Sequence, residues 1–300
     1  MSRTVAFVWV IVAYVVAFAA AWATEVAMVA YSDDVIVRAL VADVVATFVI
    51  FLFSMALSNS SMYDAYWSVA PVPIFVLFVV QPEAADGVFL RQALAGFVVC
   101  FWAVRLTLNW ATGWPGMQHE DWRYVRLAQQ TGRLWPLVSF SGVHLMPTLL
   151  VFAGCLALWP AVTSPAPLGW LDGVAFVVGA GAVVIEAVSD IQLRRFAKRR
   201  TDPSEVMQTG LWAWSRHPNY LGEIGFWLGL YLFALATGPD AAWTGVGVFA
   251  MFLLFVGISI PMMEKRMVAK RPGYAAVQHR IPMLFPWPPS RGADSGAERA

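Results

Sequence analysis

The chain has 300 residues, of which 59% are hydrophobic and 13% are charged, and its net charge is +1. A soluble domain is about one quarter charged, so this composition excludes an ordinary soluble protein and predicts that lipid covers part of the surface. The near-neutral charge gives no indication of a nucleic-acid partner. The four histidines and two cysteines form no recognisable metal-binding motif.

Eight apolar segments follow one another along the chain, most of them long enough to cross a bilayer as a helix of about 20 residues. The third segment is short and holds Asp64, Pro71 and Pro73, so we expect it to be broken or re-entrant. The predicted fold is an all-α polytopic membrane bundle of seven or eight transmembrane helices. The segments are 4–24, 35–57, 64–80, 88–108, 138–159, 169–189, 219–237 and 242–262.

Lysine and arginine are distributed unevenly between the two sets of connecting segments. With eight spans, 18 of the 20 basic residues fall on the side that holds both termini, and only Arg38 and Arg91 fall on the other. The positive-inside rule therefore predicts cytoplasmic N- and C-termini. We expect a single transmembrane domain over 1–286 and a disordered tail over 287–300, which is rich in Pro, Gly, Ala and charge.

Polar residues are retained at the inner end of the sixth span. Glu186, Asp190 and Arg194 recur every four residues and therefore share one helical face. A solvated helix end with ion pairs would explain the pattern equally well. Glu186, however, still belongs to the apolar span, where a carboxylate needs a partner or a ligand.

The seventh span begins with a polar motif. Pro218 suits the first turn of a helix, so we expect the helix to start near His217 at the cytoplasmic face. The free N–H groups of that turn, with Arg216 beside them, predict an anion site. Three polar residues then enter the bundle: Asn219, Tyr220 and Glu223. An interfacial belt is the alternative interpretation, but it does not explain Glu223.

The segment that follows the eighth span, 259–287, mixes Glu264 and Arg266 with Met, Tyr, Ile and Phe. This composition predicts a segment that packs back over the cytoplasmic mouth of the bundle. Two lone polar residues have structural interpretations: we expect Asp43 to face the bundle and be paired, and His144 to be a satisfied structural histidine.

Three stretches in the C-terminal part together resemble a membrane superfamily. They are 186–192, 215–223 (SRHPNYLGE), and 259–266 with 271–274 (SIPMMEKR and RPGY). The superfamily includes steroid 5-alpha-reductases, sterol C14 and C7 reductases and isoprenylcysteine carboxyl methyltransferase, and the chain is most similar to a bacterial steroid-5-alpha-reductase-like branch. Arg-His-Pro-x-Tyr is shared by reductases and methyltransferases, whereas the continuation Asn-Tyr-x-Gly-Glu favours the reductases.

The resemblance implies an enzyme that uses NADPH to reduce a carbon–carbon double bond conjugated to a carbonyl, in a steroid-like or other lipid substrate. It implies that the C-terminal part, about 169–286, binds the cofactor. The residues expected to do so are Glu186, Asp190, Arg194, Arg216, His217, Asn219, Tyr220, Glu223, Arg266 and Tyr274. Glu186 departs from the pattern, because the eukaryotic steroid reductases carry Asn at that position.

The groups that polarise the substrate carbonyl in the reductases have no clean match in this chain. The nearest candidates are Tyr63, Asp64 and Tyr66. In the alternative interpretation, Asp64 caps the third span and Tyr66 belongs to an interfacial belt. The segment 120–124 (EDWRY) is a further candidate, as an amphipathic lid or as a solvated loop.

Two other functions stay open at this stage. A methyltransferase that uses S-adenosylmethionine would need less positive charge around its cofactor, and a non-enzymatic transporter or scaffold would spread polar residues along a transmembrane path. The expected partners are the lipid bilayer and a lipophilic small molecule, and the sequence does not fix the oligomeric state. The expected location is a bacterial inner membrane, with the active site facing the cytoplasm.

Overall fold

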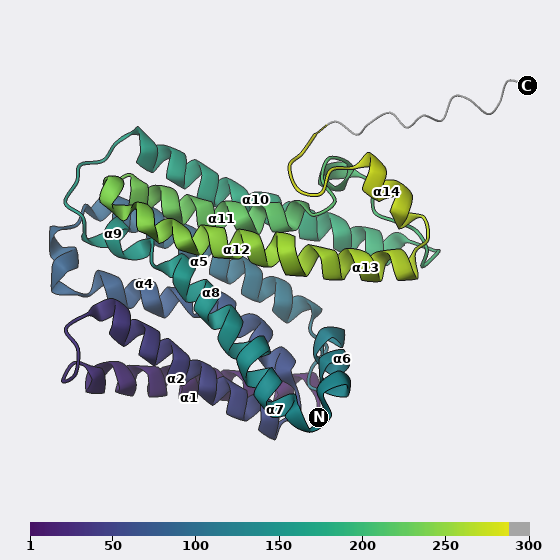
Figure 1. The fold of residues 1–300 in the computed structure, drawn as a ribbon, viewed down its shortest axis with the longest axis horizontal. Helices are drawn as coiled ribbons and strands as arrows, with labels where there is room; N and C mark the ends of the chain where they lie inside the picture. Colours follow the sequence, from purple (N-terminus) through teal and green to yellow (C-terminus); the bar gives the residue numbers. More distant parts are fainter. Residues whose placement is uncertain (288–300) are drawn as a thin grey trace, which may run out of the picture.

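The eight predicted apolar segments all become helical in the computed structural model, which describes residues 1–287 (Figure 1). Seven helical stretches of this part are long and apolar enough to cross a membrane, and no strand occurs among the described residues. The prediction of an all-α membrane bundle is therefore confirmed. The tail predicted at 287–300 lies, apart from residue 287, outside the described residues.

The helices run largely side by side along the longest axis of the molecule (Figure 1). The N-terminal half contains α1 (Arg3–Met28), α2 (Val35–Ala56), η1 (Ser60–Ala65), α3 (Tyr66–Val69), α4 (Pro71–Val79), η2 (Pro82–Asp86), α5 (Phe89–Gly113), α6 (Trp122–Thr131), η3 (Gly132–Leu134), α7 (Trp135–Val138) and η4 (Ser139–Leu145). The C-terminal half contains α8 (Met146–Cys155), α9 (Leu158–Thr163), α10 (Trp170–Arg199), η5 (Gly210–Ala213), α11 (Pro218–Leu235), η6 (Pro239–Gly245), α12 (Val246–Leu254), η7 (Phe255–Ser259), α13 (Ile260–Lys270) and α14 (Tyr274–Arg280).

The third span is broken, as its prolines predict. It starts as the 3-10 helix η1 and continues through α3 into α4, which begins at Pro71. The side chain of Asn59 caps the start by accepting a hydrogen bond from the Ser61 N–H at 3.0 Å. Proline lacks the N–H that continues a helical ladder, so the segment changes geometry where the prolines lie. The whole stretch, Ser60–Val79, has the length and hydropathy of a span.

The helix α11 is not among the seven candidate spans, and its first turn carries the predicted polar motif. It begins at Pro218 with His217 as the preceding cap residue, which confirms the predicted start. It lies between α10 and α12 (Figure 1). Small residues allow α10 and α11 to pack closely: a Cβ added at Gly229 would lie 2.5 Å from the Cα of Gly179. This contact holds the polar faces of the two helices together.

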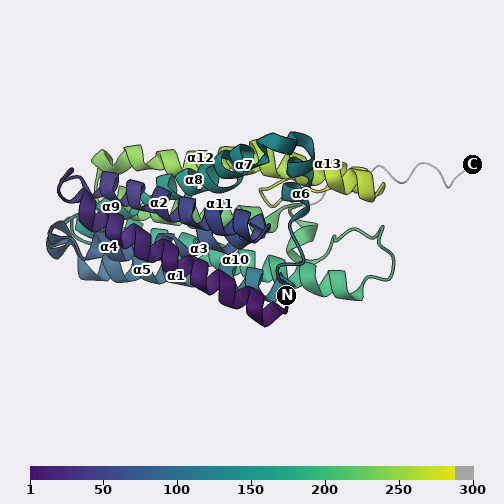
Figure 2. The ribbon, with the colours of Figure 1, turned by 90° about the horizontal axis from the view of Figure 1, so that it is seen from below.

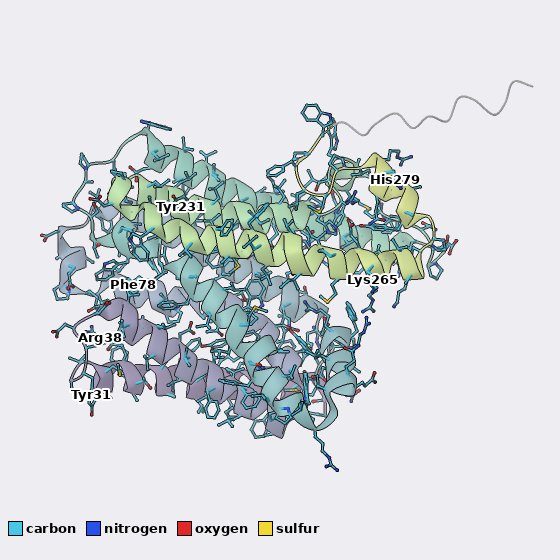
Figure 3. The ribbon with its side chains drawn as sticks, viewed as in Figure 1. Tyr31, Arg38, Phe78, Tyr231, Lys265 and His279 are labelled. Carbon is cyan, nitrogen blue, oxygen red and sulfur yellow. The ribbon has the colours of Figure 1, made fainter. Side chains whose placement is uncertain are left out.

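Basic segments gather at one end of the bundle. Lys265 and His279 lie at one end, and Tyr31 and Arg38 lie at the other (Figure 3). The helices α6 and α13 and the N-terminus lie toward the Lys265 end in two perpendicular views (Figures 1 and 2). We call this the basic end. By the positive-inside rule it is the end we expect to face the cytoplasm.

The two basic residues predicted on the opposite side are both buried and paired. Arg91 is 0% exposed, and its Nε donates to Asp172 at 2.6 Å. Arg38 donates to Glu25 at 2.9 Å. Their charges are therefore neutralised within the protein.

Candidate functional site

A cavity of about 930 Å³ opens at the basic end, between the N-terminal helices and the α10–α13 helices. Its volume lies within the range of ligand sites in proteins. The polar residues of its wall are Tyr63, Asp64, Asn109, Arg123, Tyr124, Arg126, Gln130, Glu186, Asp190, Asn219, Tyr220, Glu223, Ser259 and Lys265. The remaining wall is mainly Trp, Leu, Met, Val, Phe and Pro side chains.

This cavity brings together residues that the sequence singled out on four separate stretches of the chain. Those on its wall are Tyr63 and Asp64 from η1, Tyr124 from α6, Glu186 and Asp190 from α10, and Asn219, Tyr220 and Glu223 from α11. The helix α6 contributes to the wall, so the segment 120–124 leads into a helix beside the cavity. Of its two alternatives, the amphipathic lid agrees with this position.

One arginine that sequence reasoning did not assign to the site organises its acidic side. Arg105 of α5 forms ion pairs with both Glu186 and Asp190. Asn109, one turn further along α5, donates to Asp190 at 2.8 Å. A signal for this role was available, because Arg105 is an arginine inside an apolar span and Glu186 needs a partner. The pairing itself depends on how α5 and α10 pack.

Glu223 is fixed by two indole groups. It is 3% exposed, and its carboxylate accepts hydrogen bonds at 2.9 Å from Trp102 and at 2.9 Å from Trp227. Trp102 in turn stacks on Phe226 with ring centroids 4.3 Å apart. Both donors are held in the aromatic core, so the carboxylate has a single well-defined position at the cavity wall.

Two acceptor atoms at this wall lack a hydrogen-bond partner among the described residues: Oε2 of Glu186 and Oδ1 of Asn219. Both atoms are buried. An unsatisfied buried acceptor costs about 1–3 kcal/mol, so such groups usually meet a ligand or solvent. The two atoms therefore indicate where a ligand with N–H or O–H donors would bind.

The catalytic candidates divide into two groups. The Tyr124 hydroxyl donates to Asp64 at 2.5 Å, and both residues line the cavity. Tyr63 also lines it, and its hydroxyl lies 2.8 Å from that of Thr148. Tyr66 does not line the cavity: it is buried against α2, where its hydroxyl donates to Asp43 at 3.0 Å. The expected pairing of Asp43 is thereby confirmed, and Tyr66 acquires a structural partner.

Three of the residues expected at the cofactor instead meet a neighbouring carboxylate. Glu264 accepts from Arg216 at 2.7 Å, lies 3.0 Å from His217 Nε2, and accepts from Gln278 at 2.7 Å and Tyr274 at 3.4 Å. Arg216 also donates to the backbone carbonyls of residues 278 and 281. This cluster, which we call the Glu264 network, holds α14 against α11 and α13 and lies outside the cavity wall. The segment after the eighth span thus packs back on the bundle, as predicted.

Burial and the neighbouring Glu264 carboxylate raise the pKa of Tyr274, because both disfavour its phenolate form. The phenol therefore stays protonated in the folded protein and donates to the carboxylate.

The remaining two cofactor candidates, Arg266 and Arg194, are not lining residues of the cavity, but each contacts a residue that is. The guanidinium carbon of Arg266 is 3.7 Å from the ring centroid of Trp122, whose indole lines the cavity. This contact joins α13 to α6. Arg194 donates to Asn109 and, at 3.3 Å, to Thr112.

His144 is buried, and its two ring nitrogens contact the Ser139 carbonyl and the Ser54 hydroxyl, as its structural interpretation predicts.

Comparison with known proteins adds family membership to this geometry. Residues 50–281 match the family described as "Protein of unknown function (DUF1295)". A similar protein is the uncharacterized protein C594.04c of Schizosaccharomyces pombe, 26% identical over 251 residues, which cover 76% of this chain and 73% of that protein. No solved structure gives a significant match. Since this relative is fungal, the bacterial inner membrane stays a prediction from the sequence.

Proposed function

The chain belongs to the DUF1295 family, and from that premise and its cavity we propose that it is a membrane reductase. The proposed reaction is hydride transfer from NADPH to a carbon–carbon double bond conjugated to a carbonyl in a lipid-like substrate. One observation carries the proposal: residues predicted for the cofactor and residues predicted for the substrate carbonyl line the same cavity.

The donor and acceptor groups of the wall fit the proposed cofactor. The unpartnered acceptors of Glu186 and Asn219 suit the amide and hydroxyl donors of a nicotinamide riboside. Three basic side chains that line the same cavity, Arg123, Arg126 and Lys265, suit phosphate groups. When bound, NADPH would supply the hydride.

The chain's own residues would handle the carbonyl and the exclusion of water. Asp64 of η1 and Tyr124 of α6 form a short hydrogen bond at the cavity wall. A hydroxyl or protonated carboxyl there can donate to a carbonyl oxygen and draw electron density from the conjugated double bond. Trp67, Trp110 and Trp122 line the same cavity and limit the access of water to it.

Methyl transfer from S-adenosylmethionine is a second candidate, favoured by a different observation. The carboxylates of Glu186, Asp190 and Glu223 line the cavity, and Arg105 pairs with the first two. A net negative wall would suit a sulfonium cation. The transporter alternative has less support, because a second hollow, at α9 and η6, shares no lining residue with the cavity.

Binding measurements on variants test the proposal. Asn219→Ala removes an acceptor that has no hydrogen-bond partner among residues 1–287, so we expect the Kd for NADPH to rise about 2- to 10-fold, the equivalent of one hydrogen bond. Glu83→Gln, an exposed change in η2, is the matched control. Equal affinity of Asn219→Ala and the control would exclude Asn219 from the cofactor site.

A further inference from the structure

A second hollow, of about 310 Å³, lies where α9 meets the turn from α11 into η6. The helix α9 and the α13–α14 region lie at opposite ends of the longest axis (Figure 1). Tyr231, whose hydroxyl donates to the Ala242 carbonyl of η6 at 3.3 Å, lies toward the end that holds Tyr31 and Arg38 (Figure 3). The second hollow is therefore at the end opposite the basic end. Its wall consists of Trp159, Pro160, Thr163, Ser164, Thr237, Gly238, Asp240, Ala241 and Trp243.

The second hollow lies at the depth where two membrane spans end. The stretch Trp122–Thr163 ends at Thr163, which belongs to the wall, and the stretch Pro239–Lys270 begins between two other wall residues, Gly238 and Asp240. The ends of spans leave the hydrocarbon core and enter the head-group region of the bilayer. A ligand at this depth is therefore a lipid head group.

The wall carries a negative side chain and, as far as the structure describes the chain, no lysine, arginine or histidine. Asp240 is exposed, and it forms no ion pair among residues 1–287. Gly238 has a φ of 139°, which favours glycine, and the turn at this residue brings Thr237 and Asp240 to the same hollow. The charge of the wall thus suits a cation and opposes an anion.

Two threonine hydroxyls of the wall add hydrogen-bond acceptors. Thr163 donates its hydroxyl hydrogen to the Trp159 carbonyl at 2.8 Å, and Thr237 donates to the Ala234 carbonyl at 2.7 Å. A hydroxyl has one hydrogen and two lone pairs, so both groups can still accept a hydrogen bond. With the Asp240 carboxylate they form a set of three acceptors, which matches the three N–H donors of a primary ammonium group.

Two indole rings border the same hollow. Trp159 is half-buried and packs edge-to-face on Phe78 with ring centroids 5.3 Å apart, whereas Trp243 is 54% exposed. Indole attracts cations more strongly than the other aromatic side chains do. An interfacial aromatic belt would explain the two tryptophans, but it gives no role to Asp240. The combination of indole rings and a carboxylate is typical of an ammonium site.

We propose that the second hollow binds the primary ammonium of a phospholipid head group of the ethanolamine class. The ligand contacts the end of one span and the start of another, so it holds the two together at this membrane face. The site shares no lining residue with the cavity at the basic end and does not depend on the proposed reductase function.

Native mass spectrometry of the full-length chain tests the site. The protein is released from detergent micelles that hold equal amounts of phosphatidylethanolamine, phosphatidylcholine and phosphatidylglycerol with identical acyl chains. Phosphatidylcholine keeps the cation but has no N–H donor, and phosphatidylglycerol has no cation. We expect most adducts with phosphatidylethanolamine. Asp240→Asn and Trp243→Leu should each lower these adducts about 2- to 5-fold, the range of an exposed ion pair or cation–π contact, and leave phosphatidylglycerol adducts unchanged.

Asp86→Asn and Trp170→Leu are the matched controls, because both residues are exposed and neither lines the second hollow. They should keep the lipid preference of the parent. Equal adducts for the three lipids, or a preference that persists in both test variants, would overturn the site. Equal adducts of phosphatidylethanolamine and phosphatidylcholine would overturn the primary ammonium. Calorimetric titration with free ethanolamine separates the two sources of the amine: binding of ethanolamine without any lipid preference would overturn the head group as the ligand.

Discussion

Replacing Glu264 by glutamine should destabilise the protein without weakening its cofactor binding. The Glu264 and Arg216 side chains are only 12% and 11% exposed, so their ion pair is largely shielded from water. Glutamine keeps the shape and one acceptor of Glu264 but turns the second oxygen into a donor that faces other donors, among them Gln278. Removing one partner of a buried pair costs about 3–5 kcal/mol, and the retained acceptor favours the lower end, about 3 kcal/mol.

The free energy of unfolding, measured in mixed micelles of mild detergent and sodium dodecyl sulfate, provides the assay. Glu205→Gln is the control, because Glu205 is exposed and, within the part of the chain that the structure describes, its side chain accepts only from Thr201 and the Asp202 N–H. It should lie within about 0.5 kcal/mol of the parent. Limited proteolysis should cut Glu264→Gln faster near α14.

The reasoning would be refuted if Glu264→Gln unfolded like the control. It would also be refuted if the variant kept its stability and lost NADPH affinity, since Arg216, His217 and Tyr274 would then act as ligand contacts, as the sequence motif first indicated.

Three further predictions concern other parts of the chain. Arg91→Leu leaves Asp172 buried without its cation, so the free energy of unfolding should fall by about 3–5 kcal/mol. A double variant with Asp172→Asn should recover part of this loss, and an unchanged free energy of unfolding in the single variant would contradict the prediction. The raised pKa of Tyr274 means that, as the pH rises, the unfolded chain loses the phenol proton before the folded protein does. The contribution of Tyr274 to the free energy of unfolding is therefore fully present below pH 10.0 and decreases as the pH rises above it. Tyr274→Phe should reduce the slope of unfolding free energy against pH in that range, and an unchanged slope would argue against the shift. Arg266→Gln removes a cation–π contact of about 0.5–2 kcal/mol with Trp122, so amide hydrogens of α6 should exchange faster; unchanged exchange would mean that the contact does not hold α6.

The course of the helices was predictable from local sequence. Apolar runs of sufficient length fix where α1, α2, α5 and α10 lie, since each must satisfy its own backbone in lipid. The start of α11 was predictable from Pro218, and the break in the third span from Pro71. Each of these features depends on residues that are neighbours in the chain.

The partners of the polar residues were not predictable in the same way. The sequence places Arg216 and His217 at a helix start that suits an anion, and in the structure their anion is Glu264, 47 or 48 residues away. Arg105 reaches the α10 carboxylates only because α5 packs on α10.

Small changes of helix geometry also separate candidates that look equivalent in the sequence. Tyr63 and Tyr66 are three residues apart, and their rings lie 5.7 Å from one another. The chain changes from 3-10 to α-helix between them, and only Tyr63 lines the cavity.

Calorimetric titration of the full-length, detergent-purified protein with NADPH, NADH and S-adenosylmethionine tests the central claim most directly. A ligand that binds only the folded protein also raises its unfolding temperature, so a thermal shift on the same samples provides a second readout. The proposed reductase should bind NADPH in preference to S-adenosylmethionine and be stabilised by it. Binding and stabilisation by S-adenosylmethionine alone would contradict the reductase and assign the cavity to methyl transfer.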